Sequence, residues 1–250
     1  MLRRASVFLF FLAVMCALGA LSERAYSGLV MQQVVYEEGS PNKEELTLYV
    51  QGNKLKQELS NTPYSSAIIY DLNSGDVTMI FGESNSYLIM SRDEFLQNIQ
   101  KQAVLNKQDI VSPGDLILKK SDENIKIADF ESASYVIYNN DKVVYEYWIS
   151  EDPAISEEMD LKKWSKLQVE IAKRTQSSLG SEMVSDKLID IVEEIFKDGY
   201  PMKTVQHSSD GKTSLIEEII SVKKEDIPTT EFLPPAGYEK ITYQDILNQQ

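Results

Sequence analysis

The chain has 250 residues, with 39 acidic and 25 basic side chains and a net charge of −14. This charge repels nucleic acid and anionic membrane surfaces, so it argues against both as direct partners. The only cysteine is Cys16 and the only histidine is His207, which excludes zinc fingers and redox cysteine pairs.

The N-terminal 27 residues have the three-part plan of a secretory signal. Two arginines precede an apolar run that ends at about Leu21, and small residues follow at Ala25 and Ser27. We expect cleavage after Ser27. The alternatives are cleavage after Ser22, or retention of the apolar run as an N-terminal membrane anchor, because its length is at the lower limit for a span. Cleavage predicts a periplasmic protein with no transmembrane segment, in which residues 28–250 form one domain.

The part of the chain after the signal begins as short strands separated by turns. Alternation of apolar and polar residues, with turn-forming residues between, is typical of an antiparallel meander. It predicts a strand at 28–36, a hairpin over 46–59 turned at Gly52-Asn53, a second hairpin over 67–81 turned at 71–76, and a strand at 87–90.

The next pattern is helical. Ser91 and Glu94 fit a capping box, and the apolar residues that follow at helical spacing predict a helix to about Asn106.

The second half mixes strands and helices. Aromatic strands predict a hairpin over 135–150. Apolar stripes at helical spacing predict two helices, the first starting at Ser156 and the second capped by Ser185 and ended by Gly199. A hairpin over 202–222 and a short helix at 243–247 follow. Together these elements predict an α+β fold, with one strongly curved antiparallel sheet and helices packed on it.

Several motifs in the second half resemble a family of secreted bacterial proteins of unknown function, DUF4412. The resemblance rests on Trp148-Ile149-Ser150, Gly199-Tyr200-Pro201, Asp210-Gly211-Lys212, and Asp226-Ile227-Pro228 with the closing Pro235-Ala236-Gly237-Tyr238. That family looks like the periplasmic lipoprotein carriers of the LolA/LolB type. The resemblance implies an open half-barrel with an apolar concave face that is covered by helices. In the carriers, such a cavity holds acyl chains.

A lipid, an acyl chain or another apolar molecule is therefore the expected ligand. Candidate lining residues sit in the middle of predicted strands: Met79, Phe81, Leu88, Met90, Val143, Tyr145, Tyr147 and Trp148. Polar replacements of Tyr147 and Phe81 are expected to reduce ligand retention. The alternative is a core that fills itself, in an envelope sensing or interaction module that binds a protein partner through a helical insert at about 156–197.

No catalytic, metal or cofactor site is predicted. His207 is followed by Ser208 and Ser209, but neighbours on a strand point to opposite faces, which is poor geometry for a nucleophile and its base. The segment 71–76 resembles the start of a calcium loop, yet its glycine comes one position early and the required glutamate is missing, so a hairpin turn is favoured. We expect a non-enzymatic protein.

Overall fold

The structure is a computed structural model that describes residues 27–60, 66–105, 116–179, 186–197, 199–208 and 211–247. The predicted signal segment lies outside these residues except for Ser27. Ser185, Ser209 and Asp210 also lie outside the described residues. None of the described helices is long and apolar enough to cross a membrane.

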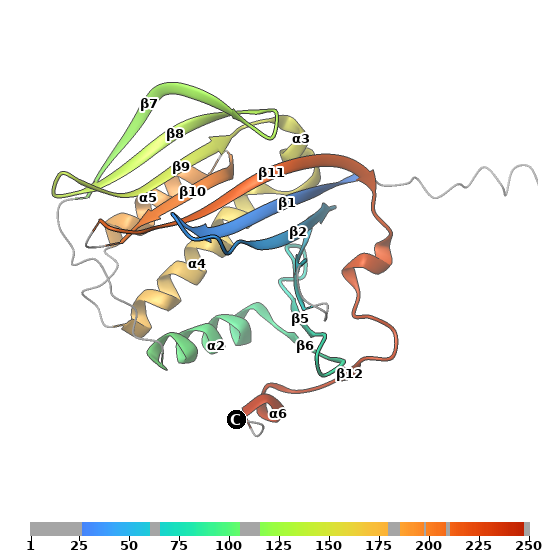
Figure 1. Cartoon of the computed structure of the whole chain (residues 1–250). Coiled ribbons are helices and arrows are strands. Elements are labelled where there is room, and N and C mark those ends of the chain that lie inside the picture. Colours follow the sequence, from blue (N-terminus) through green and yellow to red (C-terminus); the bar gives the residue numbers. More distant parts are fainter. Residues whose placement is uncertain are drawn as a thin grey trace, which may run out of the picture.

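The described residues form one large open sheet in the order β12-β6-β5-β4-β3-β2-β1-β11-β10-β9-β8-β7. Neighbouring strands are antiparallel except β12 and β6, which pair in parallel. The sheet is not closed into a barrel, and it bends between β2 and β5 (Figure 1). Its strands are β1 Ser27–Glu37, β2 Glu44–Gln51, β3 Lys54–Leu59, β4 Ala67–Asp71, β5 Val77–Phe81, β6 Ser86–Met90, β7 Leu116–Ile127, β8 Phe130–Asn139, β9 Lys142–Ser150, β10 Tyr200–His207, β11 Ser214–Asp226 and β12 Glu239–Lys240.

The predicted strands are confirmed, and the turns between them have the expected chemistry. Gly52 and Asn53 both have positive φ, at 55° and 68°, which is the conformation that a tight two-residue hairpin requires. One pairing joins distant parts of the chain: β1 lies between β2 and β11, with Ser27 opposite Asp226 and Glu37 opposite Leu215. This pairing joins the N-terminal meander to the C-terminal hairpins.

The helices are α2 Arg92–Leu105, α3 Pro153–Glu158, α4 Leu161–Leu179, α5 Asp186–Phe196 and α6 Tyr243–Leu247, with a 3-10 turn η1 at Thr229–Phe232. The start of α2 is confirmed. The backbone N–H of Ser91 donates to Glu94 at 2.9 Å, and the N–H of Glu94 donates to the Ser91 hydroxyl at 3.4 Å, which completes the capping box.

The predicted start of the next helix at Ser156 is wrong. Asp152 caps α3 by accepting the N–H of Ala154 at 2.9 Å, and Ser156 lies inside that helix. A separate helix, α4, begins after Asp160, whose carboxylate accepts the N–H groups of Lys162 and Lys163. An aspartate that bonds two otherwise unpaired N–H groups is the stronger cap, so the segment divides into two helices.

Gly199 does not end α5, which stops at Phe196. This glycine allows a close approach between strands instead. A Cβ at Gly199 would lie 2.2 Å from Ile149 Cγ2 and 3.0 Å from the Ser150 carbonyl oxygen, so a side chain does not fit here.

Apolar residues pack on both faces of the sheet. On one face, Leu48 and Leu55 from the sheet belong to a cluster that also contains Phe95 of α2 and Leu167 of α4, and α2 and α4 lie below β1 and β2 in Figure 1. On the same face, α5 packs over the outer strands. Part of the opposite face, over strands β4 and β5, is covered by the C-terminal segment, which places Phe232 against Ile69 and Ile80.

Candidate functional site

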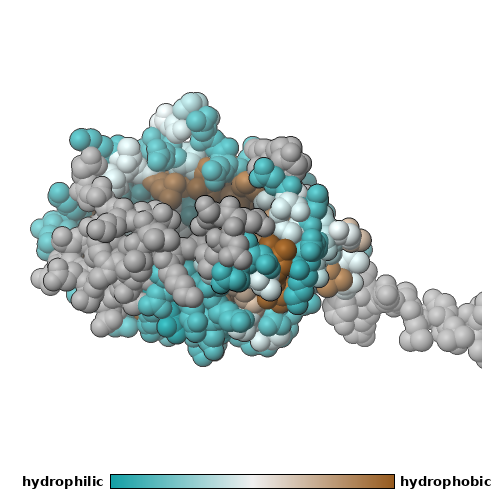
Figure 2. Space-filling model, turned by 90° about the horizontal axis from the view of Figure 1, so that it is seen from below, coloured by the Kyte–Doolittle hydropathy of each residue, from teal (hydrophilic) through white to brown (hydrophobic). Residues whose placement is uncertain are grey.

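A cavity of about 450 Å³ lies between the sheet and helices α2, α4 and α5. Its walls come from strands β1–β4 and β9–β11 and from all three helices. Figure 2 views the molecule from below and shows apolar residues in recesses between hydrophilic surfaces. The lining residues are Gln33, Leu48, Leu55, Gln57, Tyr70, Phe95, Ile99, Tyr147, Trp164, Gln168, Ile171, Phe196, Tyr200, Pro201, Met202, Thr204, Glu217, Glu218 and Ile219.

One part of the cavity is apolar and aromatic. Tyr70 on β4 makes edge contacts with the ring of Phe95 on α2, at 5.8 Å between centroids, and with Trp164 on α4, at 6.0 Å. Leu48 and Leu55 complete this wall from β2 and β3. These residues share a face because the side chains of a strand alternate and the register places Leu55 opposite Tyr70.

The other part is built by a row of residues across three strands. Thr204 on β10 lies opposite Tyr147 on β9 and opposite Glu217 on β11, and all three line the cavity. Directly opposed residues in a sheet point to the same side. Phe196 of α5 covers this row, with its ring edge-on to Tyr147 at 5.4 Å between centroids.

Glu217 is the polar centre of this second part. Its side chain is exposed to solvent, and the partial desolvation of the carboxyl group against the cavity wall raises its pKa. The Gln33 amide donates to it at 3.5 Å. Burial also raises the pKa of Tyr147 and of Tyr200, and the charge of Glu217 raises both pKa values further. The carboxylate and both buried phenols line the same cavity.

Of the predicted lining residues, Tyr147 lines the cavity. Tyr145 stacks on Tyr147 at 6.0 Å between centroids. Val143 is opposite Tyr138 near the start of β9, and Trp148 lies beneath Lys203, whose Nζ is 5.3 Å from the ring centroid. The remaining four are on the cavity-bearing face and pack in or against the main apolar cluster, but they do not line the cavity: Met79, Phe81, Leu88 and Met90.

Glu217, Thr204 and Tyr200 were not predicted as site residues, although Tyr200 belongs to the Gly199-Tyr200-Pro201 motif. In the sequence, the polar residues of β10 and β11 have the pattern of an ordinary hairpin that is exposed to solvent. Alternation along β11 places Glu217 and Ile219 on one face and Glu218 on the other. This alternation was the sequence signal that could have placed Glu217 on the same face as the buried Ile219. It does not show which face of the sheet the helices cover.

His207 forms a polar network on the sheet with Glu146 and Ser214. Its Nε2 is 2.7 Å from Glu146 Oε1, and its Nδ1 is 3.1 Å from Ser214 Oγ. In serine hydrolases the nucleophile bonds Nε2 and the acid bonds Nδ1, so the order here is reversed. Ser214 is only 5% exposed, so a substrate carbonyl cannot reach its hydroxyl. The network is not arranged for acyl transfer.

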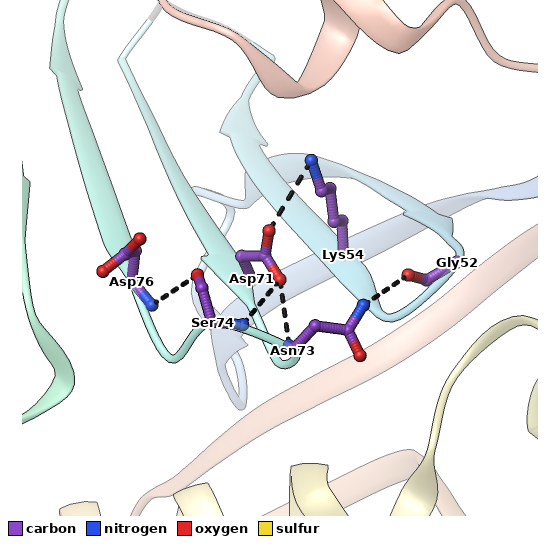
Figure 3. Close-up of polar contacts among 6 residues, drawn as sticks. All are labelled: Gly52, Lys54, Asp71, Asn73, Ser74 and Asp76. Carbon is purple, nitrogen blue, oxygen red and sulfur yellow. Dashed lines mark hydrogen bonds and ion pairs between the residues drawn. The ribbon is translucent and has the colours of Figure 1, made fainter.

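The segment 71–76 forms a hairpin turn (Figure 3). Asp71 accepts the backbone N–H groups of Asn73 at 2.9 Å and Ser74 at 3.2 Å, and its other oxygen is 3.6 Å from Lys54 Nζ. The Asn73 amide donates to the Gly52 carbonyl of the neighbouring turn at 3.3 Å. These bonds use the carboxylate to shape the turn. Among the described residues, no group of three or more metal-ligating side chains gathers anywhere.

Comparison with known families identifies the chain. The model of a domain of unknown function, DUF4412, matches residues 26–238. The chain belongs to the DUF4412 family. The resemblance noted from the motifs of the C-terminal half is thereby confirmed, and it extends over both halves of the sheet. No curated protein matches the sequence.

Solved structures resemble this DUF4412 protein at low identity. An uncharacterised conserved protein from Thermus thermophilus matches 92% of this chain and 99% of its own, with 9% identity and a TM-score of 0.44. The MucA/MucB complex of Pseudomonas aeruginosa matches 90% of this chain and 62% of the other, with 9% identity and a TM-score of 0.42. A LolA superfamily protein from Nitrosomonas europaea matches 84% and 90%, with 9% identity and a TM-score of 0.29. At these scores the similarities carry no functional argument.

Proposed function

We propose that this DUF4412 protein is an exported, non-enzymatic binding protein that holds an acyl chain or another apolar ligand. In this proposal the sheet is a LolA-like half-barrel, the helices pack on its concave side, and the cavity between them is the binding site. Residues 1–27 act as a cleaved signal, and residues 28–250 are a single periplasmic domain.

The observation that supports this proposal is the cavity itself. Its volume of about 450 Å³ is within the range of roughly 300–1,000 Å³ that small-molecule sites occupy. Most of its lining side chains are apolar or aromatic, and they come from two separate layers, the sheet and the helices. An apolar chain that enters such a space gains about 0.8 kcal/mol for each buried methylene group.

The first experiment is native mass spectrometry of the protein purified from the periplasm after expression of the full chain. We expect the protein mass to correspond to a chain that starts at Gly28. We also expect an additional mass from a bound ligand, which disappears on organic extraction. A protein that carries no extra mass and takes up no apolar probe would contradict the proposal. That result would support the alternative, a self-filled interaction module that recognises an envelope protein.

A pair of variants tests whether the cavity is the binding site. Tyr147 lines the cavity, whereas Phe81 packs elsewhere on the same face. We expect Tyr147→Gln to weaken ligand retention by about tenfold, which corresponds to 1.4 kcal/mol, and Phe81→Gln to retain ligand like the wild type. Both are measured by the bound fraction in native spectra, with circular dichroism confirming that each variant is folded. Equal retention by Tyr147→Gln and the wild type would exclude this cavity.

A further inference from the structure

The charges in the cavity are of one sign. Its described lining residues include two glutamates and no lysine, arginine or histidine. Glu218 borders the cavity, but alternation along β11 directs its side chain to the other face of the sheet, where its Oε2 lies 3.5 Å from Lys203 Nζ. Among the described residues, the side chain that hydrogen-bonds to Glu217 is the neutral amide of Gln33, at 3.5 Å. The cavity therefore contains a carboxylate whose charge no described cation balances.

Aromatic rings line the same cavity as this carboxylate. In the row Tyr147–Thr204–Glu217 the two outer strands are two strand spacings apart, which is roughly 10 Å between their backbones, and the three side chains are on the same face of the sheet. Phe196 is edge-on to Tyr147 at 5.4 Å, and Tyr200 also lines the cavity. Aromatic faces attract cations within about 6 Å of the ring centre, and quaternary ammonium groups are recognised in this way.

We infer that the preferred ligand is a single-chain amphiphile with a cationic ammonium head. The head lies against Glu217 and the rings of Tyr147 and Phe196, and the chain extends toward the apolar wall formed by Leu48, Leu55, Tyr70, Phe95 and Trp164. This inference rests on the proposed function, and it names the class of ligand that the cavity selects.

An anionic head is disfavoured for the same reasons. The carboxylate of a fatty acid would face Glu217 with no described basic residue in the cavity lining to offset the repulsion. Like charges at short range in a partly desolvated site cost more than they do in water. A neutral head avoids the repulsion but does not gain the ion pair.

Three amphiphiles with the same twelve-carbon chain test the inference: dodecyltrimethylammonium, dodecyl maltoside and laurate. Each is titrated into the periplasmic protein below its micelle concentration, and affinity is measured by isothermal titration calorimetry. We expect the ammonium compound to bind at least tenfold more tightly than laurate, with the maltoside between them. In Glu217→Gln we expect this preference to fall to threefold or less.

Glu225→Gln is the matched control. Glu225 is on the same strand and is exposed, and it does not line the cavity. Both variants change the net charge by one, so they separate a local ion pair from general attraction to an acidic protein. A preference that is absent in the wild type, or that persists unchanged in Glu217→Gln, would overturn the inference but leave the proposed function intact. Failure of all three amphiphiles to bind would overturn both.

Discussion

Glu217 illustrates how one side chain can serve a site at a cost to the fold. A glutamate in the unfolded chain has a pKa of about 4.3, and burial raises the pKa of Glu217 in the folded protein. Below both pKa values the group is neutral in both states and affects stability little. Above the folded pKa, the folded protein must keep a charge in a partly desolvated place, so the free energy of unfolding is reduced.

This sign predicts how Glu217→Gln changes stability with pH. The glutamine has nearly the same shape and carries no charge, so it removes the penalty only where the carboxylate is ionised. We expect the midpoint of thermal unfolding to rise by about 1–2 °C at pH 8 and to stay unchanged at pH 3.5, measured by calorimetry without ligand. A rise of equal size at both pH values would show that the effect is not electrostatic.

At the scale of elements, helices α3 and α4 show how single capping residues determine where a helix begins. Asp152 and Asp160 each accept N–H groups at the start of a helix, whereas the Ser156 hydroxyl donates to the Pro153 carbonyl oxygen within α3. Asp160 also donates its N–H to Asn53 at 2.6 Å. The cap therefore ties the start of α4 to the turn between β2 and β3.

The caps give a direct test of these boundaries. We expect Asp160→Ala to lower the free energy of unfolding by about 1 kcal/mol, because it removes the acceptor of two N–H groups. Ser156→Ala is expected to change it by less than about 0.5 kcal/mol. Chemical denaturation with urea measures both values. A larger loss in Ser156→Ala than in Asp160→Ala would contradict the assigned helix starts.

At the scale of the whole molecule, the two faces of the sheet are covered by different parts of the chain. Helices α2, α4 and α5 pack on the cavity-bearing face, while the segment after β11 covers the part of the other face that contains β4 and β5. Lys56 binds this segment, with its Nζ 2.5 Å from Glu231 and 2.8 Å from Glu58. Phe232 is 6% exposed there, and the adjacent Leu233 is 54% exposed.

These neighbouring residues test how much the C-terminal segment contributes to stability. We expect Phe232→Ala to cost about 3 kcal/mol, because it leaves a cavity against Ile69 and Ile80. For a domain of this size the thermal midpoint would fall by about 6–12 °C. Leu233→Ala is expected to have almost no effect. Similar midpoints for the two variants would show that this segment does not stabilise the sheet.

Sequence patterns predicted the local elements well, for reasons that are themselves local. Gly52 and Asn53 predict a turn because both tolerate positive φ, and Ser91 with Glu94 predicts a helix start because the pair satisfies two N–H groups. The strand alternation likewise predicted an antiparallel meander. It could not show that Ser156 competes with two better caps only four residues away on either side.

The strands, their turns and the family can be predicted from the chain alone, because hydrophobic alternation, turn residues and short motifs act over a few positions. The position of the cavity, and the place of Glu217 in its wall, depend on how distant segments pack. Gln33 and Glu217 are 184 residues apart in the chain and meet through the β1–β11 pairing. Alternation tells which residues share a face, but the chain must fold before one face is covered by helices and a solvated glutamate becomes the centre of a cavity.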